Sequence, residues 1–175
     1  MELPGSSYLY ALATISITYA GFAVLVTVFR QVMGGALSGF DIFFIRSVLA
    51  RSFMIAGFAM LPPLLALFEL PPSIIWRSSS AAAAILQGIF VLTWPARRRA
   101  VTDTPLPRSS VVNNVFQLLT ALFLLVNALG IVFNPAAGPF AAGVTAFMLS
   151  AAVSYMIALK LLLQTPSKGK GMRRR

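Results

Sequence analysis

Five long apolar stretches, separated by short polar segments rich in glycine, proline and arginine, divide the chain. A helix needs about 20 mostly apolar residues to cross roughly 30 Å of hydrocarbon. The pattern therefore predicts transmembrane helices at about residues 8–30, 39–70, 73–94, 111–133 and 139–163. We expect an all-α integral membrane bundle that occupies residues 1–165 as a single domain, followed by a basic cytoplasmic tail at residues 166–175.

The second stretch is too long for a plain span and carries Asp41, Arg46 and Arg51 in its first half. A charged side chain at the centre of a transmembrane helix costs about 2.5–3.5 kcal/mol on insertion scales. The sequence therefore predicts a membrane portion at residues 52–70, with Arg51 snorkelling at the inner face and residues 40–50 projecting or lying in the interface.

Pro62 and Pro63 fall inside this second stretch. Each proline removes a backbone donor and clashes with the preceding turn, which favours a kink. The alternative is that the helix ends near Met60 and that the following residues form an irregular segment.

Composition excludes most soluble classes and most catalytic chemistry. The chain is 58% hydrophobic and 10% charged, whereas a soluble domain carries about a quarter charged residues. With no cysteine and no histidine, it has no thiolate nucleophile, imidazole base, disulfide or Cys- or His-ligated metal. None of its four acids falls in the middle of a predicted span. We therefore predict a non-enzymatic protein without catalytic residues, cofactor or metal.

The net charge of +10 comes from 14 basic and four acidic residues. Thirteen of the 14 basic residues would lie on one side of the predicted bundle, and Arg77 would lie on the other. Cytoplasmic loops carry such an excess of Lys and Arg, so the pattern predicts an N-out, C-in orientation and argues against nucleic-acid binding. It also predicts a rim facing anionic headgroups on the cytoplasmic side. The rim residues are Arg46, Arg51, Arg97, Arg98 and Arg99.

The last predicted helix carries small residues at every fourth position, a pattern that lets a partner backbone approach closely. The stripe consists of Gly138, Ala142, Ala146, Ser150, Ser154 and Ala158. A shorter version, Ser80, Ala84 and Gly88, lies in the third predicted helix. Two interpretations remain open, namely packing within the bundle and a seam between copies of the chain.

The fourth predicted helix has a polar face. Asn113, Thr120, Asn127 and Asn134 are seven residues apart, and Gln117 falls on the same face. Amides of this kind avoid lipid and face other helices or a wet cavity. The polar face either forms hydrogen bonds between helices or lines one wall of a polar path or ligand site. The candidate partners are Gln87, Thr14, Ser16 and Thr18.

Residues 14–38 contain Ala20-Gly21-Phe22, Phe29-Arg30-Gln31 and Gly34-Gly35-Ala36-Leu37-Ser38. This stretch resembles the openings of uncharacterised small bacterial multi-pass inner-membrane proteins. The resemblance implies a location in the bacterial inner (plasma) membrane and brings no activity.

Two functions follow from these patterns. The first is an accessory or self-associating subunit of a membrane assembly, as a homo-oligomer or within a larger complex. The alternative is a small channel or carrier for a neutral or weakly polar solute, lined by the polar face of the fourth predicted helix.

Overall fold

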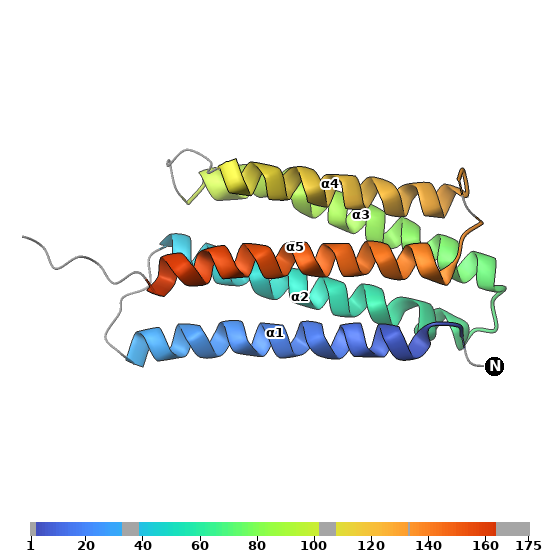
Figure 1. Cartoon of the computed structure of the whole chain (residues 1–175), viewed down its shortest axis with the longest axis horizontal. Coiled ribbons are helices and arrows are strands. Elements are labelled where there is room, and N and C mark those ends of the chain that lie inside the picture. Colours follow the sequence, from blue (N-terminus) through green and yellow to red (C-terminus); the bar gives the residue numbers. More distant parts are fainter. Residues whose placement is uncertain (1–2, 33–38, 102–107, 133, 164–175) are drawn as a thin grey trace, which may run out of the picture.

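Five antiparallel helices make up the bundle seen in the computed structural model (Figure 1). The structure describes residues 3–32, 39–101, 108–132 and 134–163, so the predicted tail at residues 166–175 lies outside the described residues. The helices are α1 (Ser6–Val32), α2 (Gly39–Ala66), α3 (Pro72–Arg99), α4 (Arg108–Leu129) and α5 (Ala137–Leu163). The predicted all-α class is confirmed.

Within the described residues, all five helices are long and apolar enough to cross a membrane. The shortest, α4, has 22 residues, which is about 33 Å at 1.5 Å per residue. The chain is therefore built as a multi-pass membrane protein. We refer to the end of the bundle where α1, α3 and α5 finish and α2 and α4 begin as the basic end. Arg46, Arg97 and Arg99 are exposed there.

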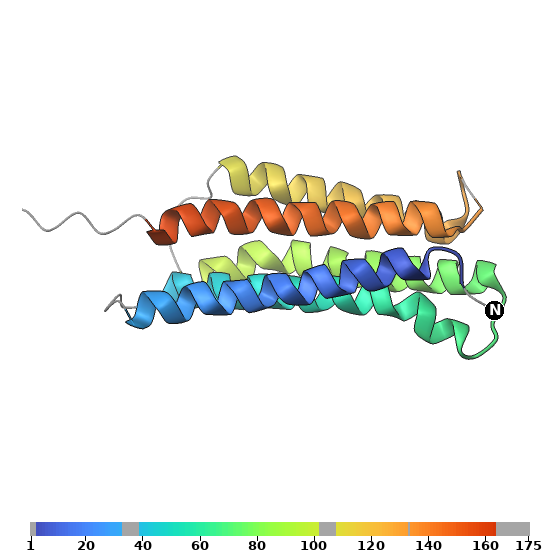
Figure 2. The ribbon, with the colours of Figure 1, turned by 60° about the horizontal axis from the view of Figure 1, so that its bottom comes forward.

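The helices form two tight pairs, α1 with α2 and α3 with α4. Helices α2 and α3 contact each other, and α5 packs against both pairs. Helix α5 contacts all four other helices, whereas α1 and α4 lie at opposite edges of the bundle (Figures 1 and 2). The edge helices α1 and α4 are the least covered by protein. Their outward faces are accordingly rich in exposed leucine, valine and phenylalanine, as lipid contact requires.

Aromatic side chains fill the core around α5. Phe140 packs against Trp76 with ring centroids 5.7 Å apart, and Phe147 packs against Phe58 at 6.3 Å. Toward the basic end, Tyr19 of α1 contacts Tyr155 edge-on at 4.9 Å. The Tyr19 hydroxyl also donates a hydrogen bond of 3.1 Å to the Ala152 carbonyl oxygen. These contacts hold α1 against α5 although most of the α1 surface is exposed.

Helix α2 differs from the prediction at both ends. The segment 40–50 does not project, because the helix is continuous from Gly39 and buries Ser47 and Val48 inside the bundle. Beyond Pro62 and Pro63 the helix continues to Ala66, and its last turns lean away from its axis (Figure 2). The alternative of a helix end near Met60 is therefore wrong, and the bend agrees with the predicted kink, although the helix ends at Ala66 and not at residue 70. The chain turns only after Ala66, where Glu69 adopts a positive φ of 54°.

Helix α3 continues beyond its predicted end at Trp94 and includes Pro95 and the three arginines that follow. A proline inside a helix removes one backbone donor but does not end the helix where neighbouring contacts hold it. The arginines therefore form the last turn of α3 and not a loop.

Candidate functional site

The polar face of α4 points into the bundle. Gln117 and Asn127 are fully buried, Thr120 is 6% exposed, and Asn113 is half-buried. Asn134 lies beyond the end of α4 and is exposed. The structure thus brings the four residues within α4 together as one interior polar column.

The column begins with a three-helix cluster toward the basic end. The Asn113 amide donates to Ser154 Oγ at 2.8 Å and accepts from Ser150 Oγ at 2.8 Å. Ser154 Oγ also accepts a hydrogen bond of 2.8 Å from Arg51 Nη1 and donates to the Ser150 carbonyl oxygen at 3.0 Å. These four residues, which we call the Arg51 cluster, join α2, α4 and α5.

Arg51 does not snorkel to the interface as predicted, because it is only 5% exposed. It lies ten residues inside the span that begins at Asp41, about 15 Å along the helix. Its guanidinium carbon is 5.4 Å from the centroid of the Phe90 ring, a cation–π contact. The cost of burial is offset by this ring and by Ser154, and no carboxylate contact of Arg51 is recorded among the described residues.

The middle of the column links α3 to α4. Gln87 Nε2 donates to the Gln117 backbone carbonyl oxygen at 2.9 Å, and Asn127 Nδ2 donates to Ser80 Oγ at 2.8 Å. Gln87 is thus a partner of the α4 face, as predicted. The α1 hydroxyls are not, since Thr14 and Thr18 donate to carbonyls of α1 itself and α1 does not pack on α4 in the described structure.

Several amide atoms in the column have no partner in the described protein. They are Gln87 Oε1, Asn127 Oδ1, and both Oε1 and Nε2 of Gln117. A buried polar atom without a hydrogen bond costs about 1–3 kcal/mol. The column therefore has spare hydrogen-bonding capacity at the α3–α4 interface.

The predicted small-residue stripe of α5 divides between two environments. Gly138 and Ala142 are exposed, and Ala146 is half-buried. Ser150 and Ser154 belong to the Arg51 cluster, and the side chain of Ala158 lies outside the described residues. The tight α4–α5 contact occurs instead at Gly143, where an added Cβ would lie 2.5 Å from Leu124 Cδ2.

The predicted basic rim also divides. Arg46, Arg97 and Arg99 are exposed near the basic end, whereas Arg51 and Arg98 are buried within the bundle. Two of the five expected rim residues are therefore not exposed at the surface of the bundle.

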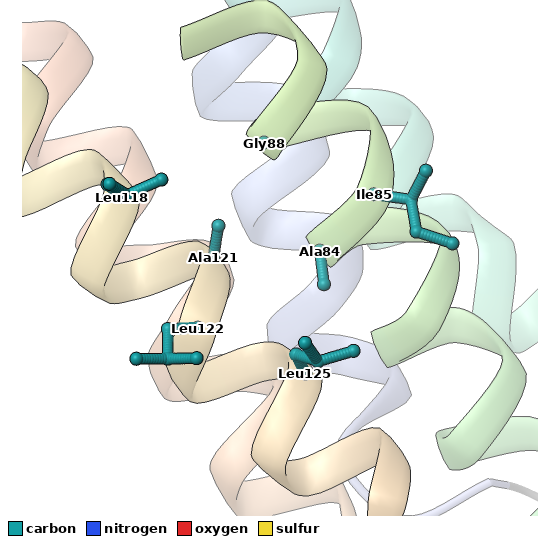
Figure 3. A pocket seen from close by; sticks show the side chains of 7 residues that line it. All are labelled: Ala84, Ile85, Gly88, Leu118, Ala121, Leu122 and Leu125. Carbon is teal, nitrogen blue, oxygen red and sulfur yellow. The ribbon is translucent and has the colours of Figure 1, made fainter. Parts of the chain in front are cut away.

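Two grooves lined by described residues lie on the lipid-facing surface. The first lies between α3 and α4, has a volume of about 360 Å³ and is almost wholly apolar (Figure 3). We call it the α3–α4 groove. Its lining consists of Ala84, Ile85, Gly88, Leu118, Ala121, Leu122 and Leu125. The second, the α2–α3 groove, has a volume of about 580 Å³ and extends to Arg97.

Sequence reasoning found only part of the α3–α4 groove. Ala84 and Gly88 belong to the predicted short small-residue stripe. Ser80, the third residue of that stripe, accepts a hydrogen bond from Asn127 and does not line the groove. The α4 side was missed. The residue that could have indicated the α4 side from the sequence is Ala121, a small residue near leucines on the face next to the amides.

The chain matches no protein-family model, no curated protein and no solved structure. The resemblance carried by residues 14–38 therefore stays a prediction, and the site must be interpreted from its own geometry.

Proposed function

We propose that this chain is a non-catalytic subunit of a membrane assembly, and that it associates with a second copy of itself through the α3–α4 groove. The observation that carries the proposal is this apolar groove, which opens toward lipid and has three small residues in its lining, the half-buried Gly88 and two buried alanines. The three residues are Ala84, Gly88 and Ala121.

Small residues matter here because apolar side chains gain no hydrophobic free energy when they leave lipid for a protein interface. Association in a bilayer relies on close packing, on polar contacts and on lipid entropy. At Gly88, an added Cβ would meet no atom within 4 Å. A ridge of side chains from another helix can therefore approach the backbone of α3 closely.

A second copy is the occupant that the surface fits best. Leu118, Leu122 and Leu125 stand along the α4 side of the groove, and all three are exposed. Their spacing of four and three residues places them on one face of the helix. The leucine ridge and the α3–α4 groove lie side by side on one surface. Under two-fold symmetry such a surface is self-complementary, since the ridge of each copy enters the groove of the other.

The interior chemistry supports a structural role over catalysis. Apart from Arg51, the polar column consists of amides and hydroxyls, which form hydrogen bonds but do not exchange protons near neutral pH. The absence of histidine and cysteine from the whole chain removes the commonest general base and the thiolate nucleophile.

The distribution of charge supports an orientation with the basic end in the cytoplasm. Arg46, Arg97 and Arg99 are exposed toward that end, and Arg77 lies near the start of α3 at the other. An excess of Lys and Arg marks cytoplasmic loops. We place the protein in a bacterial inner membrane with its basic end next to anionic headgroups.

The full-length protein in mild detergent, weighed by native mass spectrometry, tests self-association. The wild type should be dimeric, and Gly88→Leu should weaken the dimer about five- to 150-fold, since overpacking costs about 1–3 kcal/mol. Gly21→Leu on α1 is the matched control, because Gly21 is exposed and also has no atom within 4 Å of an added Cβ. A monomeric wild type, or equal effects of both variants, would overturn the proposal.

A second candidate function is a path for a neutral or weakly polar solute along the α4 amides. The unpartnered atoms of Gln87, Gln117 and Asn127 favour it, because water or solute could complete their hydrogen bonds. Flux of small polyols into proteoliposomes tests this path. Asn127→Leu should abolish flux while the protein stays folded, and flux that is no faster than in protein-free liposomes excludes the path.

A further inference from the structure

We infer that the α2–α3 groove binds one anionic phospholipid, with an acyl chain along the groove and the phosphate on Arg97. The groove opens on the lipid-facing surface between Met54 of α2 and Leu86 and Ile89 of α3. This site is separate from the α3–α4 groove, and it does not depend on self-association.

The groove has the polarity of a phospholipid. From Leu86 to Arg97 it follows eleven residues of α3, about 16 Å along the helix. Its lining is apolar except for Thr93 and Arg97, which lie at the basic end. An apolar slot that ends in a cation matches an acyl chain followed by a phosphate.

Arg97 lies at the depth of a headgroup. The apolar part of α3 begins at Ile74, and about 20 residues cover the hydrocarbon thickness. Arg97 is 23 residues beyond Ile74, so its backbone lies just outside the hydrocarbon, and its side chain reaches back along the groove to the Phe90 carbonyl oxygen.

The guanidinium of Arg97 is held in place before any ligand binds. Its Nη2 donates a hydrogen bond of 2.8 Å to the Phe90 carbonyl oxygen. Its central carbon lies 4.5 Å from the centroid of the Phe90 ring. One N–H of its five is used in this bond, and the planar fork can still offer paired donors to a phosphate. Fixing the side chain in advance lowers the entropy that binding would otherwise cost.

A second cation adds to the positive charge at this point. The buried Arg51 guanidinium lies 5.4 Å from the same Phe90 ring, and no carboxylate contact of Arg51 or Arg97 is recorded among the described residues. Two like charges near one ring repel each other, and an anion at the mouth of the groove would relieve that repulsion. Charge complementarity therefore favours an anionic lipid over a zwitterionic one.

The contrast between the two grooves identifies the occupant of each. The α3–α4 groove has no charged residue in its lining and lies beside a leucine ridge. The α2–α3 groove ends at Arg97. Among the five helices only α2 contains an acidic residue, Asp41, so α1, α3, α4 or α5 of another copy would bring no anion to that arginine, whereas a phospholipid does.

Native mass spectrometry of the full-length protein, released from nanodiscs, tests the site. The probes are phosphatidylglycerol and phosphatidylcholine of equal chain length. We expect one retained phosphatidylglycerol per chain and little phosphatidylcholine. Arg97→Gln should lower phosphatidylglycerol occupancy about tenfold, as for the loss of a charge-assisted hydrogen bond. Arg97→Lys should lower it less, because it keeps the charge but loses the fork.

Arg99→Gln is the matched control, since Arg99 is exposed in the same turn of α3 and does not line the groove. It should change occupancy less than twofold. Equal losses in Arg97→Gln and Arg99→Gln would show general attraction to the basic end and overturn the site. So would equal retention of the two lipids by the wild type.

Two further measurements distinguish other occupants. Inorganic phosphate added in lipid-free detergent should not raise the melting temperature, and a rise as large as that with phosphatidylglycerol would mean that phosphate alone occupies the site. Because the chain has no cysteine, Ile89→Cys gives a single thiol in the groove. Efficient disulfide dimers through this thiol would assign the groove to a second copy and overturn the lipid site.

Discussion

The buried amides of α4 differ in how many of their hydrogen-bonding atoms have a protein partner. Asn113 both donates and accepts, Asn127 only donates, and the side chain of Gln117 does neither. An interhelical hydrogen bond in a membrane protein contributes on average about 0.6 kcal/mol, with model systems reaching 1–2. The three amides should therefore contribute unequally to stability.

At this scale we predict opposite effects of two substitutions. Asn127→Leu should lower the free energy of unfolding by about 0.6–2 kcal/mol, because it leaves Ser80 without its partner. Gln117→Met should leave it unchanged or raise it, because it removes two unpartnered polar atoms and keeps the backbone carbonyl that Gln87 uses. Equilibrium unfolding in mixed micelles measures both.

These two substitutions also test whether the polar column is packed dry or contains water or solute. A loss of stability in Gln117→Met as large as that in Asn127→Leu would mean that water or solute already satisfies the Gln117 amide. The solute path would then gain support over a purely packed interior.

Between elements, the α4–α5 contact is closest at Gly143. An added Cβ would lie 2.5 Å from Leu124 Cδ2 and 2.8 Å from Leu124 Cγ, and Leu124 is fully buried. Because the leucine is enclosed, it cannot swing away to make room. Gly143 therefore sets the distance between the two helices.

We predict that Gly143→Ala destabilises the bundle by about 1–3 kcal/mol through overpacking. Gly138→Ala in the same helix should be neutral or stabilising, because nothing lies within 4 Å of its added Cβ and alanine is the better helix former. Melting temperatures in one detergent compare the two variants. Equal melting temperatures would mean that α5 shifts freely against α4.

The sequence was a good guide to which segments form helices, because each apolar stretch is far longer than a buried strand or loop. It was a poorer guide to helix ends. Pro95 and the arginines after it look like a stop, yet contacts of Phe90 with Arg97 accompany continuation of α3 through them. The sequence also did not show which face of α5 packs on α4. Both Gly138 and Gly143 are glycines, so residue size alone does not distinguish the open position from the close contact.

In the whole molecule, the decisive feature is that α5 packs against both helix pairs. No periodicity in the chain specifies this arrangement. Both α3 and α5 carry small-residue patterns, and the amides of α4 could face either of these two helices. The burial of Arg51 follows from it, because Ser154 of α5 provides the hydroxyl that the sequence could not place. Charge counting predicted a rim, but three-dimensional packing decides which arginines reach it.

Orientation can be measured on the whole molecule because the chain has no native cysteine. In intact cells, a membrane-impermeant maleimide should label Leu67→Cys, which lies in the exposed turn after α2. It should label Ser109→Cys, at the start of α4 near the basic end, only after permeabilisation. Leu119→Cys, on the exposed face within α4, serves as the unlabelled lipid-facing control. The reverse pattern would show that the basic end faces outward.

The central position of α5 also has a consequence for biogenesis. Helix α5 follows the other four in the chain, so it leaves the ribosome after they do. Until it has inserted, Arg51 and Asn113 have no access to Ser150 and Ser154, the hydroxyls that complete their hydrogen bonds. Closure of the polar interior therefore coincides with insertion of α5, and a chain that stalls before this step presents an unpaired cation inside the bilayer.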